Sequence, residues 1–337
     1  MEQPVGWGIM GTARIARQIV RGIGQSPIPR IGQSRGSVVS AVASRNLARA
    51  IEFAKEHDIP RAFGSYDELL QSPDVDAVYV PLPNSMHAEW TIRALEAGKP
   101  VLCEKPFAAS AGEARDMVAA SRRTGMLLAE AFMYRFHPMY ERVFGLIESG
   151  AIGRVIAINS AFTFFLEDRS EIPASGELAG GSLMDVGCYC VNFSRMIARA
   201  EPSKVFAFER RTTVDDSMVG AMAFPNGPLA HFECSIEASE RCRAEIAGTD
   251  GEIVLENAWI PGEADAVVLL RRGGEEERIV TPGVNTYRLE VEDFVRALRT
   301  GKPLRWPPED SINNMAAIDA LYESARTGHA VEVNAED

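Results

Sequence analysis

Short, almost wholly apolar runs alternate with amphipathic helical segments over residues 5–132. Runs rich in Val, Ile, Leu and Ala are typical of strands buried on both faces of a parallel sheet, with the intervening helices covering those faces. The alternation predicts a doubly wound parallel α/β sheet of the Rossmann type. The strands are expected at 5–11, 37–44, 76–83, 101–106 and 127–132, with a Pro- and Gly-punctuated loop at 26–36.

The pattern changes beyond residue 150, where apolar strands follow one another with turn signals such as PNGP and GTDG between them. This succession predicts a large, mostly antiparallel sheet covered by helices on one face, which makes the second part an α+β domain. Two late segments, 288–301 and 311–328, have a helical pattern, and each ends at a Gly, as helix C-caps commonly do.

The chain of 337 residues is too long for one compact core, and the change of pattern predicts two domains. We expect a dinucleotide-binding Rossmann domain over 1–131 and a substrate-binding and oligomerisation α+β domain over 132–337. A strand-rich sheet with few helices leaves one face open. Its alternate positions are expected to include Phe162, Phe164, Phe206 and Phe208, and such a face is a candidate interface of a homodimer or homotetramer.

Composition narrows the function classes. A hydrophobic fraction of 46% and a charged fraction of 24% are ordinary for a soluble globular protein. The net charge of −12 argues against nucleic acid as a partner, because phosphate chains need clustered Lys and Arg. We see no signal peptide and no apolar run long enough to span a membrane. Five scattered cysteines without a C-x-x-C pair indicate reduced thiols in the cytoplasm, and no metal site is expected.

The opening stretch VGWGIMGTARIA has two Gly-rich readings. Gly6 and Gly8 belong to a G-x-G-x-x-G pattern that lies inside the expected strand. The alternative places Gly11 at the end of the strand, with Ala13 and Ala16 in the second and third positions. A phosphate-binding turn must lie between the strand and the helix N-terminus, so we favour the second reading. The cofactor-binding candidates of this turn are Gly11, Thr12, Ala13, Arg14 and Ile15.

The second strand ends Ala43-Ser44-Arg45-Asn46, without the carboxylate that usually binds the ribose 2′-OH of NAD. The Arg45 guanidinium can pair with a 2′-phosphate, and Arg49, one helical turn later, can reach the same anion. Ser44 lies at the same strand end. We therefore favour NADP(H) over NAD(H) as the cofactor. The alternative is that both arginines are solvated residues at a helix start.

The stretches GTARIA, PLPNSMHA, Glu104-Lys105-Pro106, EAFMYRFHP and GGSLMDVGCYCVNF occur in this order along the chain. Together they resemble the Gfo/Idh/MocA family, and the resemblance covers essentially the whole chain. It looks closest to the branch that holds dihydrodiol dehydrogenases and sugar 1-dehydrogenases, in which a Tyr stands where inositol dehydrogenases carry a His. Tyr189 occupies that position here.

Three residues are candidates for catalysis. Lys105 lies at the carboxyl end of a strand, where a doubly wound sheet binds its ligand, and its ammonium can stabilise negative charge on a substrate oxygen. Asp185 and Tyr189 are four residues apart and would share one face of a helix. A nearby cation would lower the pKa of the Tyr189 phenol and let it exchange a proton. Asp185 would accept a hydrogen bond from a sugar hydroxyl.

Each candidate also has a structural reading. A lone lysine at a strand end is commonly a surface residue. Ser182-x-x-Asp185 is also a capping-box pattern that would open a helix, and Tyr189 can be a buried aromatic whose hydroxyl is hydrogen-bonded. The resemblance implies that Pro83, Asn84 and His87 line the nicotinamide site and that Glu104 and Arg135 lie near the cofactor. Without it, His87 would be a helix-start residue and Arg135 part of an interdomain salt bridge.

These features predict an NADP(H)-dependent oxidoreductase that acts on a polyol or carbonyl substrate, namely a sugar, a sugar derivative or a cyclic diol. Two alternatives stay open. One is a cofactor-sensing regulatory protein of the same fold that has no catalytic role. The other is an enzyme that keeps its NADP tightly held, in the manner of glucose–fructose oxidoreductase. The shape of segment 166–181, which precedes the catalytic helix, does not follow from the sequence.

Overall fold

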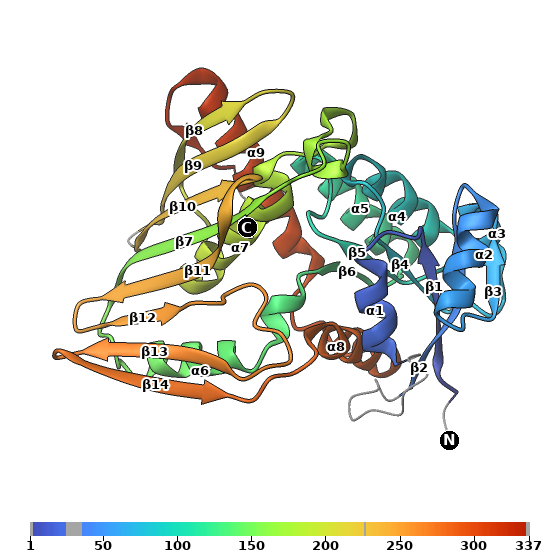
Figure 1. The fold of residues 1–337 in the computed structure, drawn as a ribbon, viewed down its shortest axis with the longest axis horizontal. Coiled ribbons are helices and arrows are strands. Elements are labelled where there is room, and N and C mark those ends of the chain that lie inside the picture. Colours follow the sequence, from blue (N-terminus) through green and yellow to red (C-terminus); the bar gives the residue numbers. More distant parts are fainter. Residues whose placement is uncertain (1–2, 25–35, 226, 335–337) are drawn as a thin grey trace. The chain divides into compact units, whose positions relative to one another are not determined.

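The structure of the chain is a computed structural model that describes residues 3–24, 36–225 and 227–334 (Figure 1). The loop expected at 26–36 lies outside the described residues except for Gly36. The chain forms two compact units. The first comprises Met1–Met133 and Asn285–Ser311, and the second comprises Tyr134–Val284 and Ile312–Asp337.

The described part of the first unit contains a six-stranded sheet in the order β3-β2-β1-β4-β5-β6, in which every neighbouring pair is parallel. The strands are β1 (Val5–Met10), β2 (Ser37–Ala43), β3 (Arg61–Phe63), β4 (Ala77–Val80), β5 (Val101–Glu104) and β6 (Leu128–Ala131). The predicted doubly wound parallel sheet is confirmed. Its strand order reverses between β1 and β4, and at such a point the carboxyl ends of the strands leave a crevice for a ligand.

The helices of this unit are α1 (Ala16–Ile23), α2 (Leu47–Glu56), α3 (Tyr66–Gln71), α4 (His87–Glu96), α5 (Ala111–Thr124) and α8 (Thr286–Thr300), with a 3₁₀ turn at Asn84–Met86. Polar residues begin several of them. The side chains of Asn46, Ser65 and Ser110 accept hydrogen bonds from backbone N–H groups in the first turns of α2, α3 and α5. These caps fix where each helix starts after its strand.

Helix α8 belongs to the first unit, although the predicted domain division assigned all of 132–337 to the second domain. Phe294 of α8 packs against Trp7 of β1, with ring centroids 5.2 Å apart and the rings tilted by 51°. At Gly22 of α1, an added Cβ would lie 3.0 Å from the backbone of Tyr287 and Arg288. An amphipathic pattern shows that a helix buries one face, but it does not show which sheet receives that face. The sequence pattern therefore did not reveal that the chain returns to the first unit at α8.

The described part of the second unit contains a nine-stranded sheet in the order β14-β13-β12-β11-β7-β10-β9-β8-β15. Only the β7–β10 pair is parallel, so the predicted mostly antiparallel sheet is confirmed. The strands are β7 (Val155–Phe165), β8 (Lys204–Arg211), β9 (Asp215–Ala223), β10 (Leu229–Ser235), β11 (Glu237–Gly248), β12 (Glu252–Leu255), β13 (Ala266–Arg272), β14 (Glu275–Thr281) and β15 (Val331–Glu332).

Helices cover one face of this sheet, and α7 packs on β7 and β10. The α-helices are α6 (Met139–Glu148), α7 (Cys188–Ala198) and α9 (Pro308–Thr327). The short helical turns are 3₁₀ turns at Met133–Phe136, Ile172–Ala174 and Gly176–Leu178 and a π-helical turn at Leu183–Gly187. The two late helices are α8 and α9, and each is followed by a Gly with positive φ, as predicted.

The prediction of the open face is correct for β8 and wrong for β7. Phe206 and Phe208 lie on the uncovered face, where Phe208 is 68% exposed. Phe162 is instead buried under α7, with its ring 5.3 Å from that of Tyr189, and Phe164 packs on a small apolar cluster. A period of two separates the two faces of a strand, but it does not say which face the helices cover.

Among the described residues, no helix combines the length and the apolar character that a bilayer crossing needs. Over the same residues, no group of three or more His, Cys, Asp or Glu side chains is arranged to hold a metal ion. All five cysteines are described; none forms a disulfide, and every one except Cys242 is buried.

Candidate functional site

The turn after β1 is built around Gly11. Because β1 ends at Met10, Gly11 and neither Gly6 nor Gly8 lies at the strand-to-helix turn, and its φ of +103° is one that favours glycine. The two earlier glycines serve packing. A Cβ at Gly6 would collide with the carbonyl oxygen of Asp74, and one at Gly8 would lie 2.8 Å from Leu69.

Gly11 also lies against the end of the neighbouring strand β4. A Cβ at Gly11 would be 3.2 Å from Leu82 Cδ2 and 4.0 Å from Tyr66 Oη, so the backbone of this turn lies close to the segment that follows β4. Ala16, which begins α1, is fully buried. The turn residues Thr12, Ala13, Arg14 and Ile15 are partly or fully exposed. The turn therefore lies directly before the N-terminus of α1, the position at which helices commonly bind phosphate groups.

At the end of β2, Ser44 is buried, and Arg45 and Arg49 are exposed. The Arg49 backbone N–H donates to Asn46 Oδ1 at 3.3 Å, so the side chain of Asn46 caps α2 and both guanidinium groups lie at the start of a helix. Burial raises the pKa of Tyr66, and the charge and hydrogen bond of the Arg45 guanidinium partly offset that rise. Arg45 therefore lies beside a phenol that borders the Gly11 turn, a neighbour that sequence reasoning missed.

His87 connects the turns that follow β4 and β5. Its ring is fully buried, with Nδ1 2.9 Å from the carbonyl oxygen of Pro106 and Nε2 2.8 Å from that of Leu82. Burial lowers the pKa of His87, and the two carbonyl groups oppose that effect. Pro83 and Asn84, before it, are partly exposed. The structure thus gives His87 a supporting place behind the turns, whereas the resemblance had placed it along the cofactor.

Glu104 shapes the backbone beside Lys105. Its carboxylate is buried and accepts hydrogen bonds from the Tyr79 hydroxyl and, at 3.2 Å, from the Lys105 backbone N–H. Burial, and after it the charge of Glu104, raises the pKa of Tyr79 well above its ordinary value. Lys105 follows at the end of β5 and is partly exposed. Lys105 therefore lies at the carboxyl end of β5, the edge at which doubly wound sheets commonly bind their ligands.

In the second unit, Tyr189 lies in the first turn of α7 among aromatic rings from three other segments. Its ring centroid is 5.7 Å from that of Tyr134, 5.3 Å from Phe162 and 6.2 Å from Trp259. Asp185 lies in the π-helical turn that precedes α7, and it is the only residue of 181–190 that is not buried. Packing therefore fixes the phenol ring, while Asp185 is partly exposed.

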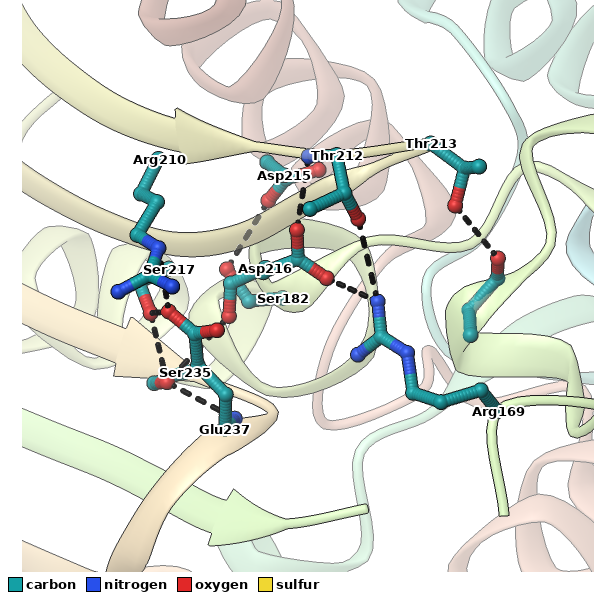
Figure 2. Close-up of polar contacts among 11 residues, drawn as sticks. Arg169, Ser182, Arg210, Thr212, Thr213, Asp215, Asp216, Ser217, Ser235 and Glu237 are labelled. Carbon is teal, nitrogen blue, oxygen red and sulfur yellow. Dashed lines mark hydrogen bonds and ion pairs between the residues drawn. The ribbon is translucent and has the colours of Figure 1, made fainter. Parts of the chain in front are cut away.

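The capping-box reading of Ser182 and Asp185 is wrong. The Asp185 backbone N–H donates to the carbonyl oxygen of Gly181 at 2.9 Å, and Ser182 Oγ donates to Asp215 Oδ2 at 3.0 Å (Figure 2). The Leu183 backbone N–H donates to the same carboxylate oxygen at 2.7 Å. A residue of β9, distant in sequence, therefore caps the segment in place of the Ser182 side chain.

Segment 166–181 forms two 3₁₀ turns that pack on the sheet. Leu166 and Ala174 join Val214 and Ile236 in a small buried cluster. The Thr213 hydroxyl donates to the carbonyl oxygen of Ala174 at 3.2 Å. Arg169 makes an ion pair with Asp216, which is 1% exposed (Figure 2). These partners come from the region around the start of β9 and from the end of β10, so no local pattern revealed the shape of the segment.

Arg135 lies in the 3₁₀ turn Met133–Phe136 and is 2% exposed. His137, two residues later, is fully buried. Its Nδ1 accepts a hydrogen bond from the Met139 backbone N–H at 3.0 Å, so the ring caps the start of α6. Burial also lowers the pKa of His137.

Comparison with known proteins gives two family matches. Residues 5–132 match the family model of oxidoreductases with an NAD-binding Rossmann fold, and residues 140–254 match the GFO/IDH/MocA C-terminal domain. The chain is 40% identical to D-xylose 1-dehydrogenase (NADP(+)) 2 of Haloferax volcanii over 336 residues, which cover 97% of this chain and 99% of that protein.

Two further proteins are similar over most of the chain. Trans-1,2-dihydrobenzene-1,2-diol dehydrogenase of Mus musculus is 37% identical over 262 residues, 76% of each chain. The crystal structure of a 3-ketoreductase from Actinomadura kijaniata, in complex with NADP and TDP-benzene, superposes with a TM-score of 0.89. That protein is 29% identical, and the match covers 96% of this chain and 98% of the other.

His137 predicts a loss of stability in mild acid. Because its folded pKa is lowered, the unfolded chain binds the proton first, and the free energy of unfolding should fall as the pH drops below about 6.5. His137→Asn keeps an acceptor for the Met139 N–H but does not titrate. Urea unfolding should show a flatter pH dependence for this variant than for the wild type between about pH 7.5 and 5.5. Equal slopes for the two proteins would contradict the assignment.

Proposed function

The chain belongs to the Gfo/Idh/MocA oxidoreductase family, and from this premise we propose that it is an NADP(H)-dependent enzyme that oxidises or reduces a sugar, a sugar derivative or a cyclic diol. The observation that carries the proposal is the edge of the parallel sheet in the first unit. There the Gly11 turn borders the end of β4, and Lys105 follows β5. Relatives named as sugar and diol dehydrogenases support the substrate class.

The residues of this edge fit a dinucleotide. Gly11 has a positive φ and no side chain, which supports close approach of a pyrophosphate to the backbone of the turn before α1. Arg45 and Arg49 are exposed, and we propose that the Arg45 guanidinium, which lies beside the Tyr66 phenol, pairs with the 2′-phosphate, in line with NADP in a named relative and in a solved structure. When bound, the nicotinamide ring supplies or accepts the hydride.

We propose that Lys105 stabilises the charge on the substrate oxygen and that Tyr189 transfers the proton of that oxygen. The Lys105 ammonium donates a hydrogen bond to that oxygen and stabilises the negative charge that develops on it. The Tyr189 hydroxyl takes the proton from the alcohol during oxidation and returns it during reduction. Asp185, which is partly exposed, accepts a hydrogen bond from a second hydroxyl and orients the substrate.

Initial rates with NADP⁺ and NAD⁺ over pentoses, hexoses, polyols and dihydrodiols test this function. We expect turnover of at least one sugar or diol and a preference for NADP⁺. Tight cofactor binding without turnover of any of them would contradict the proposal and favour a cofactor-sensing protein. NADP that co-purifies and is recycled between two sugars would instead indicate an enzyme of the glucose–fructose oxidoreductase type.

Tyr189→Phe should lower kcat by about 10²- to 10⁴-fold, because positioned acid–base catalysis contributes on that order. Cofactor affinity should change little, and fluorescence titration with NADPH measures it. Phe193→Leu is a matched control, since it alters another buried ring of α7 that has no hydroxyl. A Tyr189→Phe enzyme as fast as the wild type would remove this phenol from the mechanism.

Arg45→Ala should raise the KM for NADP⁺ by about 10- to 100-fold, because an ionic hydrogen bond to a phosphate contributes roughly 1.5–3 kcal/mol. The KM for NAD⁺, which lacks the 2′-phosphate, should stay within about twofold. Arg14→Ala removes another exposed arginine, in the phosphate turn, and serves as the comparison. An equal loss with both cofactors in the Arg45 variant would contradict its role in selectivity.

The uncovered sheet face is proposed to bind a second copy of the chain. It exposes Phe208 and Val219, which are cross-strand neighbours and are 68% and 54% exposed. The same face carries the ion pair between Arg241 and Glu233, at 2.5 Å. Apolar patches flanked by both charge signs can match themselves across a two-fold axis.

Phe208→Asp should therefore convert a dimer or tetramer into a monomer, because the interface would bury an unpaired charge. Size-exclusion chromatography with light scattering at micromolar concentration measures the mass. Ile51→Asp, at an exposed position of α2, is the control and should keep the wild-type mass. A wild-type protein that elutes as a monomer would overturn the proposed interface.

A further inference from the structure

The carboxylate of Asp215 lies at the start of the segment that carries Asp185 and Tyr189. Asp215 is the first residue of β9 and is 1% exposed. Its Oδ2 accepts a hydrogen bond from Ser182 Oγ at 3.0 Å (Figure 2). The same oxygen accepts a second one from the Leu183 backbone N–H at 2.7 Å. Its Oδ1 accepts the hydroxyl of Tyr322 from α9 at 2.8 Å. One buried side chain thus ties the segment to both the sheet and a helix.

The small residues of the GGSLMDVG stretch make room for this arrangement. Gly181 has a φ of +119°, and a Cβ there would collide with Asp215 Oδ1. A Cβ at Gly187 would lie 2.7 Å from Cys234 Sγ of β10. Ser182 Oγ lies 3.4 Å from the same sulfur atom. The segment can therefore approach β9 and β10 closely only with small residues at these positions.

Because a π-helical turn follows, the hydrogen bonds of Asp215 affect the direction of the side chains beyond them. Leu183–Gly187 begins without a side-chain cap of its own and leads directly into α7 at Cys188. A π turn contains more residues than an α turn, so it resets the direction in which the following side chains point. The direction of Asp185 and Tyr189 thus depends on where Leu183 is held. A carboxylate at a helix N-terminus also stabilises the helix dipole.

We propose that Asp215 is a positioning residue, which acts on catalysis by holding the start of the segment that presents Asp185 and Tyr189. The inference rests on the proposed function of those two residues. Asp215 touches neither substrate nor cofactor in this account. Its role is to fix the orientation of the phenol and the carboxylate, so its loss should affect kcat more than the binding of NADP.

The neighbouring Asp216 provides a matched comparison. It is equally buried, and its carboxylate makes an ion pair with Arg169 and accepts the Thr212 backbone N–H at 2.8 Å. Burial alone would raise the pKa of Asp216, but the hydrogen bonds from Thr212 and Arg169 lower it overall. Asp216 thus holds segment 166–181 rather than the π-helical turn. The two adjacent carboxylates anchor two different segments.

Asp215→Ala should lower kcat about tenfold or more, while the KM for NADP⁺ stays within about twofold of the wild type. Asp215→Asn should recover kcat to within about threefold. Its amide oxygen can accept from the Leu183 N–H, and its amide nitrogen can donate to Tyr322. Tyr322→Phe, which removes only the donor to Oδ1, should leave kcat within about threefold of the wild type. A kcat of Asp215→Ala within twofold of the wild type, or no recovery in Asp215→Asn, would overturn the proposal.

Hydrogen exchange separates this inference from the proposed function, because it needs no turnover. Amides of Leu183–Gly187 should exchange about tenfold faster in Asp215→Ala, and those of 166–171 should exchange faster in Asp216→Ala instead. If Asp215→Ala does not fold, Ser182→Ala removes one hydrogen bond to the same oxygen and should still speed exchange at Leu183–Gly187. Unchanged exchange there would overturn the inference, even in a protein that turns over sugars. Absence of turnover in the wild type would refute only the proposed function.

Discussion

The parallel strands of the first unit are buried on both faces, and this constraint determines where its polar side chains can lie. Every residue of β1, β4 and β5 is buried, so polar chemistry has room only at the strand ends. There, side chains that look functional in the sequence are used to shape the turns. His87 links two turns through carbonyl groups, and the carboxylate of Glu104 holds the backbone N–H of Lys105. The proposed ligand-binding residues Lys105 and Arg45 stand at the same strand ends.

The second unit positions its proposed catalytic side chains in a different way, because they lie on a helical segment rather than at strand ends. Aromatic rings pack around Tyr189, and Asp185 in the π-helical turn is partly exposed. The start of that turn has no cap of its own and is held by Asp215 from a neighbouring strand. The close approach of the segment to β9 and β10 also requires glycine at positions 181 and 187.

Local features were predictable from the sequence, and long-range ones were not. The doubly wound sheet, the Gly11 turn and the strand-end position of Lys105 depend on short patterns of apolar and small residues, and the structure has all three. Three features depend instead on contacts between segments that are distant in sequence. They are the packing of α8 in the first unit, the burial of Phe162 under α7 and the cap that Asp215 provides. Ser182 and Asp185 match the capping-box pattern, but the pattern does not include acceptors from distant segments, such as the Asp215 carboxylate. The paired Gly180-Gly181 was the available signal, since adjacent glycines often mark a close approach of another segment.

A crystal structure with NADP⁺ and a sugar or diol that the enzyme turns over would be the sharpest test of the roles proposed for Lys105 and Tyr189. We expect Lys105 Nζ and Tyr189 Oη both to lie within about 3.2 Å of the oxygen on the reacting carbon. If that oxygen is hydrogen-bonded to other side chains and either of these two atoms points elsewhere, the proposed chemistry is wrong.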